Sequence, residues 1–353
     1  MQSDIEDIEI EKIIEKLQDH FQVYHIDKLP DGYRLYLQAK RTLDDELKAQ
    51  LTSLTAKYDV RMGYYYGELV LEIRRRAEKK EKVWINIVLL IATFVTTTIM
   101  GSFFYQEFNI FGGLMFSFAI MFVLGSHEMG HYFAAKRWGM KTSLPYFIPF
   151  PTIIGTLGAV IRHKGPIPNR RALFDVGVSG PLVGIVASCI VIVIGLNIPF
   201  QLESYEEGLI LGTPILFELL AKLVNFDGEV IHPIAFAGWV GLFVTFLNLI
   251  PVGQLDGGHI LRAVIGKKAA IISRFMPLVL IVLGSAISYI YKVSDSIWIF
   301  WGLITLFFSL QPHPDPIDDK TPLDAKRVLL GIITFILALL CFTPVPFQIA
   351  KNL

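Results

Sequence analysis

The stretch His127-Glu128-Met129-Gly130-His131 holds three side chains that could do chemistry together. On an α-helix, residues four apart lie about 40° from each other round the axis, so both imidazoles can reach one metal ion. Zinc accepts such a pair of ligands readily. Glu128 fits the same ligand set poorly, but it can hold the water that the metal acidifies, which is the general-base role in a metalloprotease. The pattern alone also occurs by chance, because two of its five positions are free.

The residues around this motif are almost uncharged and apolar. The segment from Phe111 to Ala135 is long enough to cross the hydrocarbon of a bilayer. Ionisable residues at such a depth are costly and commonly functional, and a metal ion would neutralise and satisfy them. A plainer interpretation has the three side chains bound by hydrogen bonds to neighbouring helices. We favour the metal site.

A third protein ligand is expected, because catalytic zinc sites commonly have three and keep the fourth position open. Asp256 follows the end of an apolar segment, at a depth that we expect to match that of His131. Pro251 ends the preceding helix, and Gly257-Gly258 give the backbone freedom where the carboxylate must be aimed. His259, three residues further on, remains a competing ligand on chemical grounds.

The composition is that of a multi-span membrane protein. Of the 353 residues, 53% are hydrophobic, which is too apolar for an ordinary soluble protein. The formal net charge is +0, from 32 basic and 32 acidic residues, so no charge bias points to nucleic acid. The two cysteines, Cys189 and Cys341, lie inside apolar segments, which excludes a disulfide framework and a cysteine zinc site.

Residues 1–82 are predicted to form a small α+β domain. Apolar residues at helical spacing between Ile5 and Leu17 predict an amphipathic helix, and a second helix is expected from Thr42 to about Lys57. The domain carries no metal or nucleotide motif, so its role stays open. Three strands are expected, Phe21 to Ile26, Tyr33 to Leu37 and Tyr64 to Ile73, the first two joined at Pro30-Asp31-Gly32.

Charged residues set the expected orientation in the membrane. The basic cluster Arg74 to Lys82 directly precedes the first span, which by the positive-inside rule places the N-terminal domain in the cytoplasm. Alternation of sides then makes the helix with His127 and His131 end at the cytoplasmic face. We therefore expect a multi-pass protein of the cell membrane, with a cytoplasmic N-terminus and a metal site near the inner leaflet.

Seven spans are expected, with six as the alternative. The segment Ile297 to Leu310 is the weakest, because it reaches only about 21 Å against a hydrocarbon thickness of about 30 Å, and a re-entrant segment there would leave six. The predicted spans are Trp84 to Tyr105, Phe111 to Ala135, Ala172 to Leu196, Ile234 to Ile250, Arg274 to Lys292, Ile297 to Leu310 and Val328 to about Cys341.

The segment Leu144 to Ile161 is apolar enough to enter the membrane, yet its prolines and glycines break any helix. Extended backbone at membrane depth survives only where protein or a cavity covers its polar groups. We expect a re-entrant β-like loop beside the metal site. Its edge, with Gly155, Thr156 and Gly158, could bind an unwound substrate by strand addition. A hairpin that merely caps the cavity is an equally good interpretation.

Small residues mark the third span. Gly177, Gly180 and Gly184 let another helix approach closely, and the helix with the two histidines is the expected neighbour. Two further histidines, His163 and His232, are expected at the surface.

Three stretches carry a family resemblance: His127 to His131, Pro168 to Asp175, and Asn248 to Gly258 with its Asn-x-x-Pro-x-x-x-Leu-Asp-Gly pattern. They resemble the site-2 protease family of intramembrane zinc proteases, in particular its plastid branch called ethylene-dependent gravitropism-deficient and yellow-green, and the prokaryotic relatives of that branch. The resemblance covers about Phe111 to Arg262. It implies that His127, His131 and Asp256 bind one zinc ion per chain, that Glu128 activates water, and that Asn248 helps to bind or polarise the substrate.

The sequence thus predicts an α-helical polytopic membrane protein in three parts: a cytoplasmic α+β domain at 1–82, a catalytic membrane core at 83–262, and C-terminal transmembrane segments at 263–353. The expected function is intramembrane zinc proteolysis of membrane-spanning proteins near the cytoplasmic face, as in regulated intramembrane proteolysis. The partners implied are transmembrane substrates and the lipid bilayer, not nucleic acid.

Two rival classes remain. A membrane zinc peptidase of the prenyl-protein type would share the His-Glu-x-x-His helix but use a later glutamate, and the Leu255-Asp256-Gly257 motif argues against it. A catalytically silent chaperone of membrane proteins or a metal transporter is the second. A transporter should carry ionisable residues across the whole membrane, and a silent homologue would most simply lack Glu128.

Overall fold

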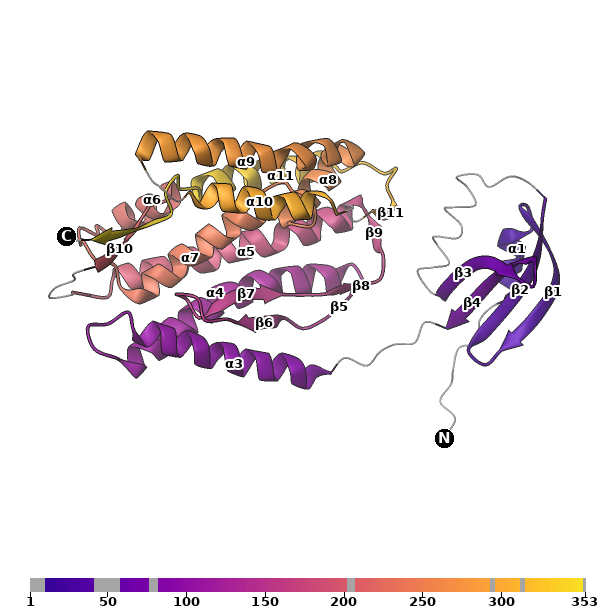
Figure 1. Ribbon diagram of the computed structural model, residues 1–353, viewed down its shortest axis with the longest axis horizontal. Helices are drawn as coiled ribbons and strands as arrows, with labels where there is room; N and C mark the ends of the chain where they lie inside the picture. Colours follow the sequence, from indigo (N-terminus) through magenta and orange to yellow (C-terminus); the bar gives the residue numbers. More distant parts are fainter. Residues whose placement is uncertain are drawn as a thin grey trace. The chain divides into compact units, whose positions relative to one another are not determined.

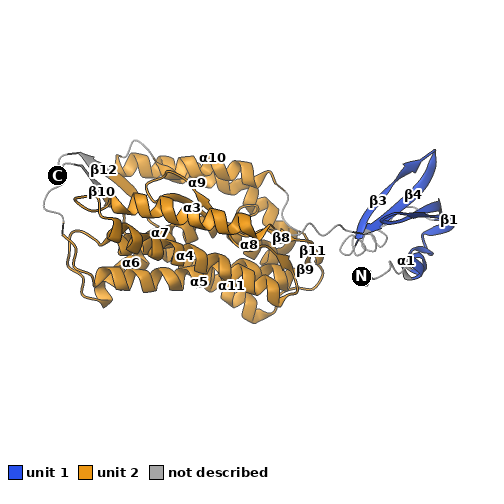
Figure 2. Ribbon diagram, turned by 90° about the horizontal axis from the view of Figure 1, so that it is seen from below, with its two compact units in different colours: residues 1–81 blue, residues 82–353 orange. Residues whose placement is uncertain are grey.

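The chain divides into two compact units, residues 1–81 and 82–353 (Figure 2). The computed structural model describes residues 10–40, 58–75, 82–201, 207–292, 296–311 and 315–351. The predicted helix from Thr42 to Lys57 lies outside these residues. The second unit contains both the predicted membrane core and the predicted C-terminal segments.

The first unit is an antiparallel four-stranded sheet with a short helix, α1 (Ile10–Leu17), packed on one face. The core of the unit contains Leu17 from the helix and Leu35 and Leu71 from the two central strands, all fully buried. The helix and the first two strands were predicted from the sequence. The strands β1 (Phe21–Leu29), β2 (Gly32–Ala39), β3 (Tyr58–Tyr65) and β4 (Glu68–Arg75) lie in the order β1-β2-β4-β3.

The single strand predicted from Tyr64 to Ile73 is wrong. The structure has two strands there, β3 and β4, joined by a tight turn at Tyr66-Gly67. Both turn residues have positive φ, 51° and 88°, which is the backbone that a two-residue hairpin requires. The sequence hid this turn because a tyrosine rarely adopts a positive φ.

The second unit is a bundle of helices in which some neighbours along the chain pack side by side and other contacts join helices that are far apart in sequence (Figure 1). Helix α4 (Ile110–Arg137) packs on α3 (Val83–Ser102), on α5 (Arg170–Leu196) and on α7 (Pro233–Asn248). After α7 comes α8 (Asp256–Ile265), joined by a 3-10 turn, Gly266–Lys268, to α9 (Ala269–Tyr291). The remaining helices are α6 (Ile215–Leu223), α10 (Ile297–Ser309) and α11 (Ala325–Leu340).

Small residues allow the central helices to approach closely. A Cβ on Gly195 of α5 would lie 2.2 Å from the backbone nitrogen of Ala235 in α7, and one on Gly238 of α7 would lie 2.6 Å from the Ile192 side chain. Between helices in an apolar medium, such close packing supplies the association that hydrophobic burial supplies in water. The interface between α5 and α7 therefore depends on these glycines.

Among the described residues, four helical segments are long and apolar enough to cross a membrane: Val83–Ser102, Ile110–Arg137, Arg170–Leu196 and Asp256–Tyr291. Two further apolar helices are shorter, Pro233–Asn248 and Ile297–Ser309. At 1.5 Å per residue these two reach about 24 Å and about 20 Å, less than the roughly 30 Å of hydrocarbon. The helical membrane architecture is confirmed in this coarser form, and the count of seven spans stays a prediction.

A β-hairpin links α4 to α5 at the place of the predicted β-like loop. Strands β6 (Tyr146–Pro149) and β7 (Thr156–Val160) form a two-stranded antiparallel sheet that packs on α3 (Figure 1). The buried Asn86 of α3 donates hydrogen bonds to the carbonyl oxygens of Leu144 and Pro145. These bonds satisfy backbone groups next to the hairpin, as extended chain among apolar helices requires.

Three small sheets tie the remaining loops of this unit together. They pair β5 (Lys141–Thr142) with β8 (His163–Lys164), β9 (Ile167–Asn169) with β11 (Pro316–Asp318), and β10 (Glu207–Leu211) with β12 (Phe347–Lys351). The parallel pair β9–β11 joins the chain before α5 to the chain before α11.

His232 is not the surface residue that the sequence suggested. It is 5% exposed and caps α7, because its Nδ1 accepts a hydrogen bond from the backbone N–H of Ile234. The rings of Tyr105 and Phe200 pack against it. The following Pro233 begins the helix, where its missing N–H costs nothing.

Candidate metal centre

Helix α4 supplies the two histidines and the glutamate of the motif. Its N-terminus is capped by the Asn109 side chain, which accepts from the Gly112 N–H, and Lys136 and Arg137 occupy its last turn, where positive charge is favourable. His127, Glu128 and His131 are 5%, 8% and 6% exposed. The three ionisable side chains are therefore buried on a helix that fits a membrane span.

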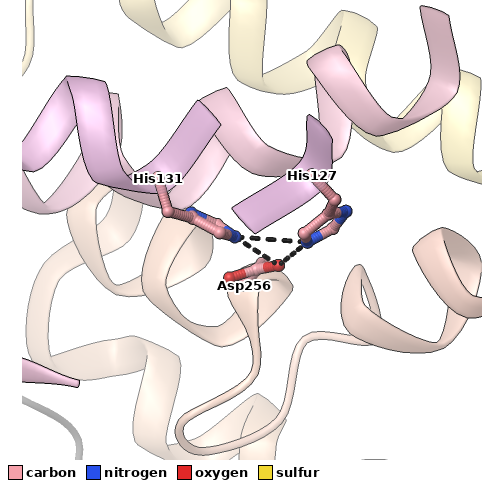
Figure 3. Close-up of side chains that lie close together, drawn as sticks. All are labelled: His127, His131 and Asp256. Carbon is pink, nitrogen blue, oxygen red and sulfur yellow. Dashed lines mark hydrogen bonds and ion pairs between the residues drawn. The ribbon is translucent and has the colours of Figure 1, made fainter. Parts of the chain in front are cut away.

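The ring nitrogens of both histidines meet one carboxylate oxygen (Figure 3). Asp256 Oδ2 lies 3.2 Å from His127 Nε2 and 3.3 Å from His131 Nε2, and the two nitrogens lie 3.2 Å apart. The three side chains form a group whose ligand atoms all lie within 4.8 Å of one another. The structure thus brings together the three predicted metal ligands.

A backbone carbonyl fixes the orientation of His131. Its Nδ1 lies 2.8 Å from the Val176 carbonyl oxygen of α5, so Nδ1 carries the hydrogen and donates it. The other ring nitrogen, Nε2, is then left as the electron-pair donor that faces Asp256. Metal-binding histidines are commonly held in this way by a hydrogen bond to their second nitrogen.

Glycines of α5 make the room for the two imidazoles. A Cβ on Gly180 would lie 2.1 Å from His131 Nε2, and a Cβ on Gly184 would lie 2.8 Å from His127 Nδ1. A Cβ on the third glycine, Gly177, would lie 3.0 Å from the Cβ of His259 in α8. The helix with the histidines is therefore the neighbour of Gly180 and Gly184, as expected, whereas Gly177 admits a different helix.

Asp256 begins helix α8, which the sequence did not predict. The chain leaves α7 at Asn248, passes Pro251 and folds back so that α8 packs on α5. Gly257 and Gly258 are helical, and their predicted role in backbone freedom is wrong. A Cβ on them would lie 2.1 Å from the Leu249 carbonyl oxygen and 2.4 Å from the Gly253 carbonyl oxygen.

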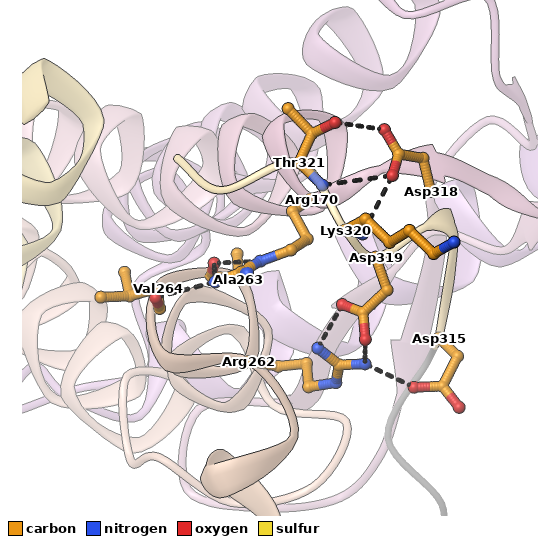
Figure 4. A network of polar contacts seen from close by, with 9 residues as sticks. All are labelled: Arg170, Arg262, Ala263, Val264, Asp315, Asp318, Asp319, Lys320 and Thr321. Atoms are coloured by element: carbon orange, nitrogen blue, oxygen red, sulfur yellow. Dashed lines mark hydrogen bonds and ion pairs between the residues drawn. The ribbon is translucent and has the colours of Figure 1, made fainter. Parts of the chain in front are cut away.

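The far end of α8 is held by two arginines (Figure 4). Arg170, in the first turn of α5, donates to the carbonyl oxygens of Ala263 and Val264, which are among the unpaired acceptors at the end of α8. Arg262 is 2% exposed and donates to Asp319 and Asp315, at 2.8 Å in each case. The helix that carries Asp256 is thus fixed at its far end by charged groups.

No pattern in the sequence predicted this network. Arg262 lies more than fifty positions from both aspartates, and only the pairing of β9 with β11 brings residues 315–319 beside α8. A second such cluster joins three helices: Asp175 of α5 accepts from Trp138 and, through both carboxylate oxygens, from Arg327. Asp175 ends a stretch that carried the family resemblance, which was the one available hint.

Glu128 and Asn248 lie beside the three ligands. Glu128 interacts with the backbone of Ile161, the residue after β7, which places the hairpin next to this carboxylate. The Asn248 side-chain nitrogen lies 3.5 Å from His127 Nε2. His259, the competing ligand, is not part of the close group of metal-binding side chains.

The predicted substrate residues lie in the hairpin. Thr156 is 1% exposed, and its hydroxyl donates to the Ile148 carbonyl oxygen and accepts from the Gly158 N–H. Gly155 has φ +78° and packs against the Thr96 backbone of α3, where a Cβ would lie 2.6 Å from the carbonyl oxygen. Gly158, with φ +104°, has open space where a Cβ would point.

The donor set fits zinc. Two imidazole nitrogens and one carboxylate oxygen are ligands that Zn²⁺ prefers, and three protein ligands leave one position open for a water molecule or a substrate. The three donor atoms lie together among apolar helices, where a bound cation would neutralise the carboxylate. His127, His131 and Asp256 are therefore the residues that would hold the ion.

The fold and the site together describe a class of protein: helical membrane proteins with a metal site of two histidines and one carboxylate. Residues 115–288 match the sequence model of peptidase family M50. This part of the chain belongs to that family, which is the site-2 protease family, and the resemblance seen in the motifs is confirmed.

Curated relatives agree. The chain is 30% identical over 253 residues to "Probable zinc metalloprotease EGY1, chloroplastic" of Arabidopsis thaliana, covering 68% of this chain and 44% of the relative. It is 30% identical over 251 residues to the Arabidopsis protein named EGY2, at 68% and 43% coverage, and 27% identical over 283 residues to EGY3 of Oryza sativa subsp. indica, at 73% and 47%. The chain thus spans less than half the length of these relatives. No solved structure matched the chain.

Replacement of Gly180 by alanine should remove zinc. The added Cβ would collide with His131 Nε2, so the imidazole must leave its position or α5 must move away. We expect at least a tenfold lower zinc content in purified Gly180→Ala, measured by mass spectrometry of the metal. Cys189→Ala, on the same helix and half-buried, should bind zinc like the unchanged protein. Equal zinc in both variants would contradict the packing described here.

Asp319 should make the free energy of unfolding depend on pH in the acidic range. The Arg262 guanidinium donates to the Asp319 carboxylate and holds its pKa below the ordinary value. A lowered pKa in the folded state stabilises the protein above the unfolded pKa of about 3.9, and this stabilisation is lost as the pH falls through the folded value. Asp319→Asn should lower the free energy of unfolding at pH 7 by about 1.5–3 kcal/mol.

The measurement is the thermal unfolding midpoint of the full chain in detergent between pH 7 and pH 3. The difference between the unchanged protein and Asp319→Asn should shrink as the pH falls below about 4, because the unfolded chain then binds a proton at this carboxylate and the folded chain does so only at lower pH. Exposed Asp227, replaced by asparagine, is the matched control. A difference that stays constant with pH would argue against the Arg262–Asp319 ion pair.

Proposed function

We propose that this chain is an intramembrane zinc metalloendopeptidase that hydrolyses peptide bonds in membrane-spanning proteins near the cytoplasmic face. The observation that carries this proposal is the close group of buried His127, buried His131 and half-buried Asp256, with Glu128 next to it, on helices that fit membrane spans. Membership of peptidase family M50 and relatives named probable zinc metalloproteases support it.

Each side chain of the site has a role in this chemistry. His127, His131 and Asp256 would hold Zn²⁺, which would lower the pKa of a water molecule to about 7 and supply a Lewis acid for a carbonyl group. The Glu128 carboxylate accepts the proton of the attacking water and passes it to the leaving amine nitrogen. The Asn248 amide, 3.5 Å from His127 Nε2, would donate a hydrogen bond to the substrate carbonyl oxygen in this proposal.

The hairpin offers an edge to an unwound substrate. Strand β7 pairs with β6 on one side, and no further strand joins this sheet in the described parts of the chain. Leu157 and Val160 of β7 are 60% and 47% exposed, and Ile161 next to them touches Glu128. A substrate segment that lies along β7 by strand addition would have its backbone beside the general base. Gly155 and Thr156 support this edge from inside, and Gly158 forms part of it.

A metal transporter fits the site less well. A transport path should show several groups of ionisable residues through the membrane. In the described residues, the close histidine, cysteine and carboxylate side chains form a single group. This favours a fixed catalytic ion over a transported one.

The proposed orientation follows from charge. Lys136 and Arg137 in the last turn of α4, together with the basic residues before α3, belong on the cytoplasmic side by the positive-inside rule. We propose on this basis a cytoplasmic N-terminal unit and a site near the inner leaflet of the cell membrane. Relatives carry the word chloroplastic in their names, which describes those proteins.

Glu128→Gln should stop proteolysis and keep zinc. An amide of the same shape cannot accept the proton, so we expect at least a 100-fold slower cleavage, because general-base catalysis contributes about 10²–10⁴ in rate. The assay uses the purified full chain in lipid nanodiscs with single-span reporter proteins whose apolar segments contain helix-breaking residues. Zinc content should stay within twofold, since Glu128 is outside the ligand group.

Glu218→Gln, on helix α6, is the matched control and should cleave at the normal rate. If Glu128→Gln cleaves within threefold of the unchanged protein, Glu128 is not the general base. If no reporter is cut by the unchanged, zinc-loaded protein, the proposed activity itself fails.

Cysteine cross-linking tests the β7 edge. In a chain with Glu128→Gln, Cys189→Ala and Cys341→Ala, we introduce Leu157→Cys and scan a single cysteine through the apolar segment of a reporter. We expect a disulfide at one or two adjacent reporter positions, since strand pairing fixes the register. Ile153→Cys, 52% exposed outside both strands of the hairpin, should give at least fivefold less product. Equal yields, or no dependence on reporter position, would rule out strand addition at β7.

A further inference from the structure

An open groove of about 910 Å³ runs between α4 and α5. This volume lies in the range of ligand-binding pockets, about 300–1,000 Å³. None of the three metal-binding side chains lines the groove, so it is separate from the site described above. On α4 the lining extends from Ser126 to Arg137, which is about 16 Å along the helix axis.

The long wall of the groove is apolar. Met129 and Phe133 line it from α4, and Val178 and Val183 from α5. Phe133 is 62% exposed and Val183 is 42% exposed, so the rim of the groove presents hydrocarbon to the surroundings. Both helices fit membrane spans, and the surroundings of this rim are therefore the acyl chains of a bilayer.

One end of the groove is polar and carries an excess positive charge. Arg137, Trp138, Asp175 and Arg327 line this end. Asp175 accepts from Arg327 at 2.7 and 2.8 Å and from the Trp138 indole N–H at 3.0 Å, so one arginine charge is neutralised there. Arg137 is exposed, and within the described part of the chain no carboxylate lies within ion-pair distance of it.

We propose that this groove binds an anionic phospholipid of the surrounding bilayer. One acyl chain lies along the apolar wall, and the phosphate is held by Arg137 at the polar end. Such a lipid fits the groove because the apolar wall ends at a basic side chain, at the end of a membrane span. Basic pockets between transmembrane helices bind anionic headgroups. The unpaired arginine selects an anionic lipid over a zwitterionic one.

The bound lipid would act on the same helix pair that forms the metal centre. Gly130 of α4 packs on the Ser179 backbone of α5, where a Cβ would lie 2.7 Å from the carbonyl oxygen. Both residues line the groove, and His131 and Gly180 are their neighbours in sequence. A lipid in the groove thus lies directly against the contact between α4 and α5 that positions the imidazoles.

The test is native mass spectrometry of the delipidated, purified full chain, titrated with phosphatidylglycerol or phosphatidylcholine. The unchanged protein should bind phosphatidylglycerol at least tenfold more tightly. Arg137→Gln should reduce this affinity at least tenfold and leave phosphatidylcholine unchanged. Lys136→Gln is the matched control: Lys136 is the adjacent cation, does not line the groove and should have an effect below twofold. Arg137 is exposed, so the variant keeps its fold.

Two tryptophan substitutions on α5 test the apolar wall of the groove. Val183→Trp should fill the groove and reduce the binding of both lipids at least tenfold, whereas Val186→Trp, 59% exposed on α5 and outside the groove, should not. Equal effects of Arg137→Gln and Lys136→Gln would overturn the headgroup assignment. Unchanged phosphatidylglycerol binding by a folded Val183→Trp, together with loss of reporter cleavage, would show that the groove takes a peptide segment and would also overturn the proposal.

Discussion

Two buried imidazoles and a half-buried carboxylate meet among apolar helices, and the cost of placing polar groups there explains the contacts around them. An isolated charge in such surroundings costs far more than the few kcal/mol that separate folded from unfolded protein, so each polar atom must have a partner. Asp256 Oδ2 faces both histidines, and the second nitrogen of His131 is used by the Val176 carbonyl oxygen. The Nε2 atoms of both histidines and the Asp256 carboxylate thus converge on one point.

The helices around the site can hold these polar side chains because their backbones approach one another closely at glycines. The imidazoles fit only because Gly180 and Gly184 of α5 have no side chains, and α8 reaches the site only because Gly257 and Gly258 pass close to carbonyl oxygens of residues 249–253, between α7 and α8. The carboxylate is then held in place from the other end of its helix by Arg170 and Arg262. The position of the Asp256 carboxylate therefore depends also on contacts about two turns further along α8, made by residues that are not metal ligands.

The part of this arrangement that could be predicted is the part that is local in sequence. Helical spacing is sufficient to put His127 and His131 on one face, and the turn-forming Pro30-Asp31 pair is sufficient to separate β1 from β2. The prediction that Asp256 joins the histidines had two sources. Two histidines alone leave a catalytic zinc ion one protein ligand short, and the family resemblance assigns that ligand to Asp256. The contacts between Arg262 and Asp319 had no local signal, because they arise from a fold-back of the chain that no periodicity encodes. The turn at Tyr66-Gly67 was missed for a different reason, since its first residue is a type that disfavours the required backbone.

Helix α4 contributes to three environments at once. One face carries His127 and His131 against α5 and α8, Glu128 touches the chain next to the hairpin at Ile161, and Phe133 and Arg137 line an open groove. A helix with such varied neighbours cannot shift to suit one of them without disturbing the others, since Gly130 already packs on the Ser179 backbone. In the proposed function, adaptation to a substrate would therefore fall to the hairpin, since strand β7 can add a partner at its free edge and keep its pairing with β6 while the ligand-bearing helices stay fixed.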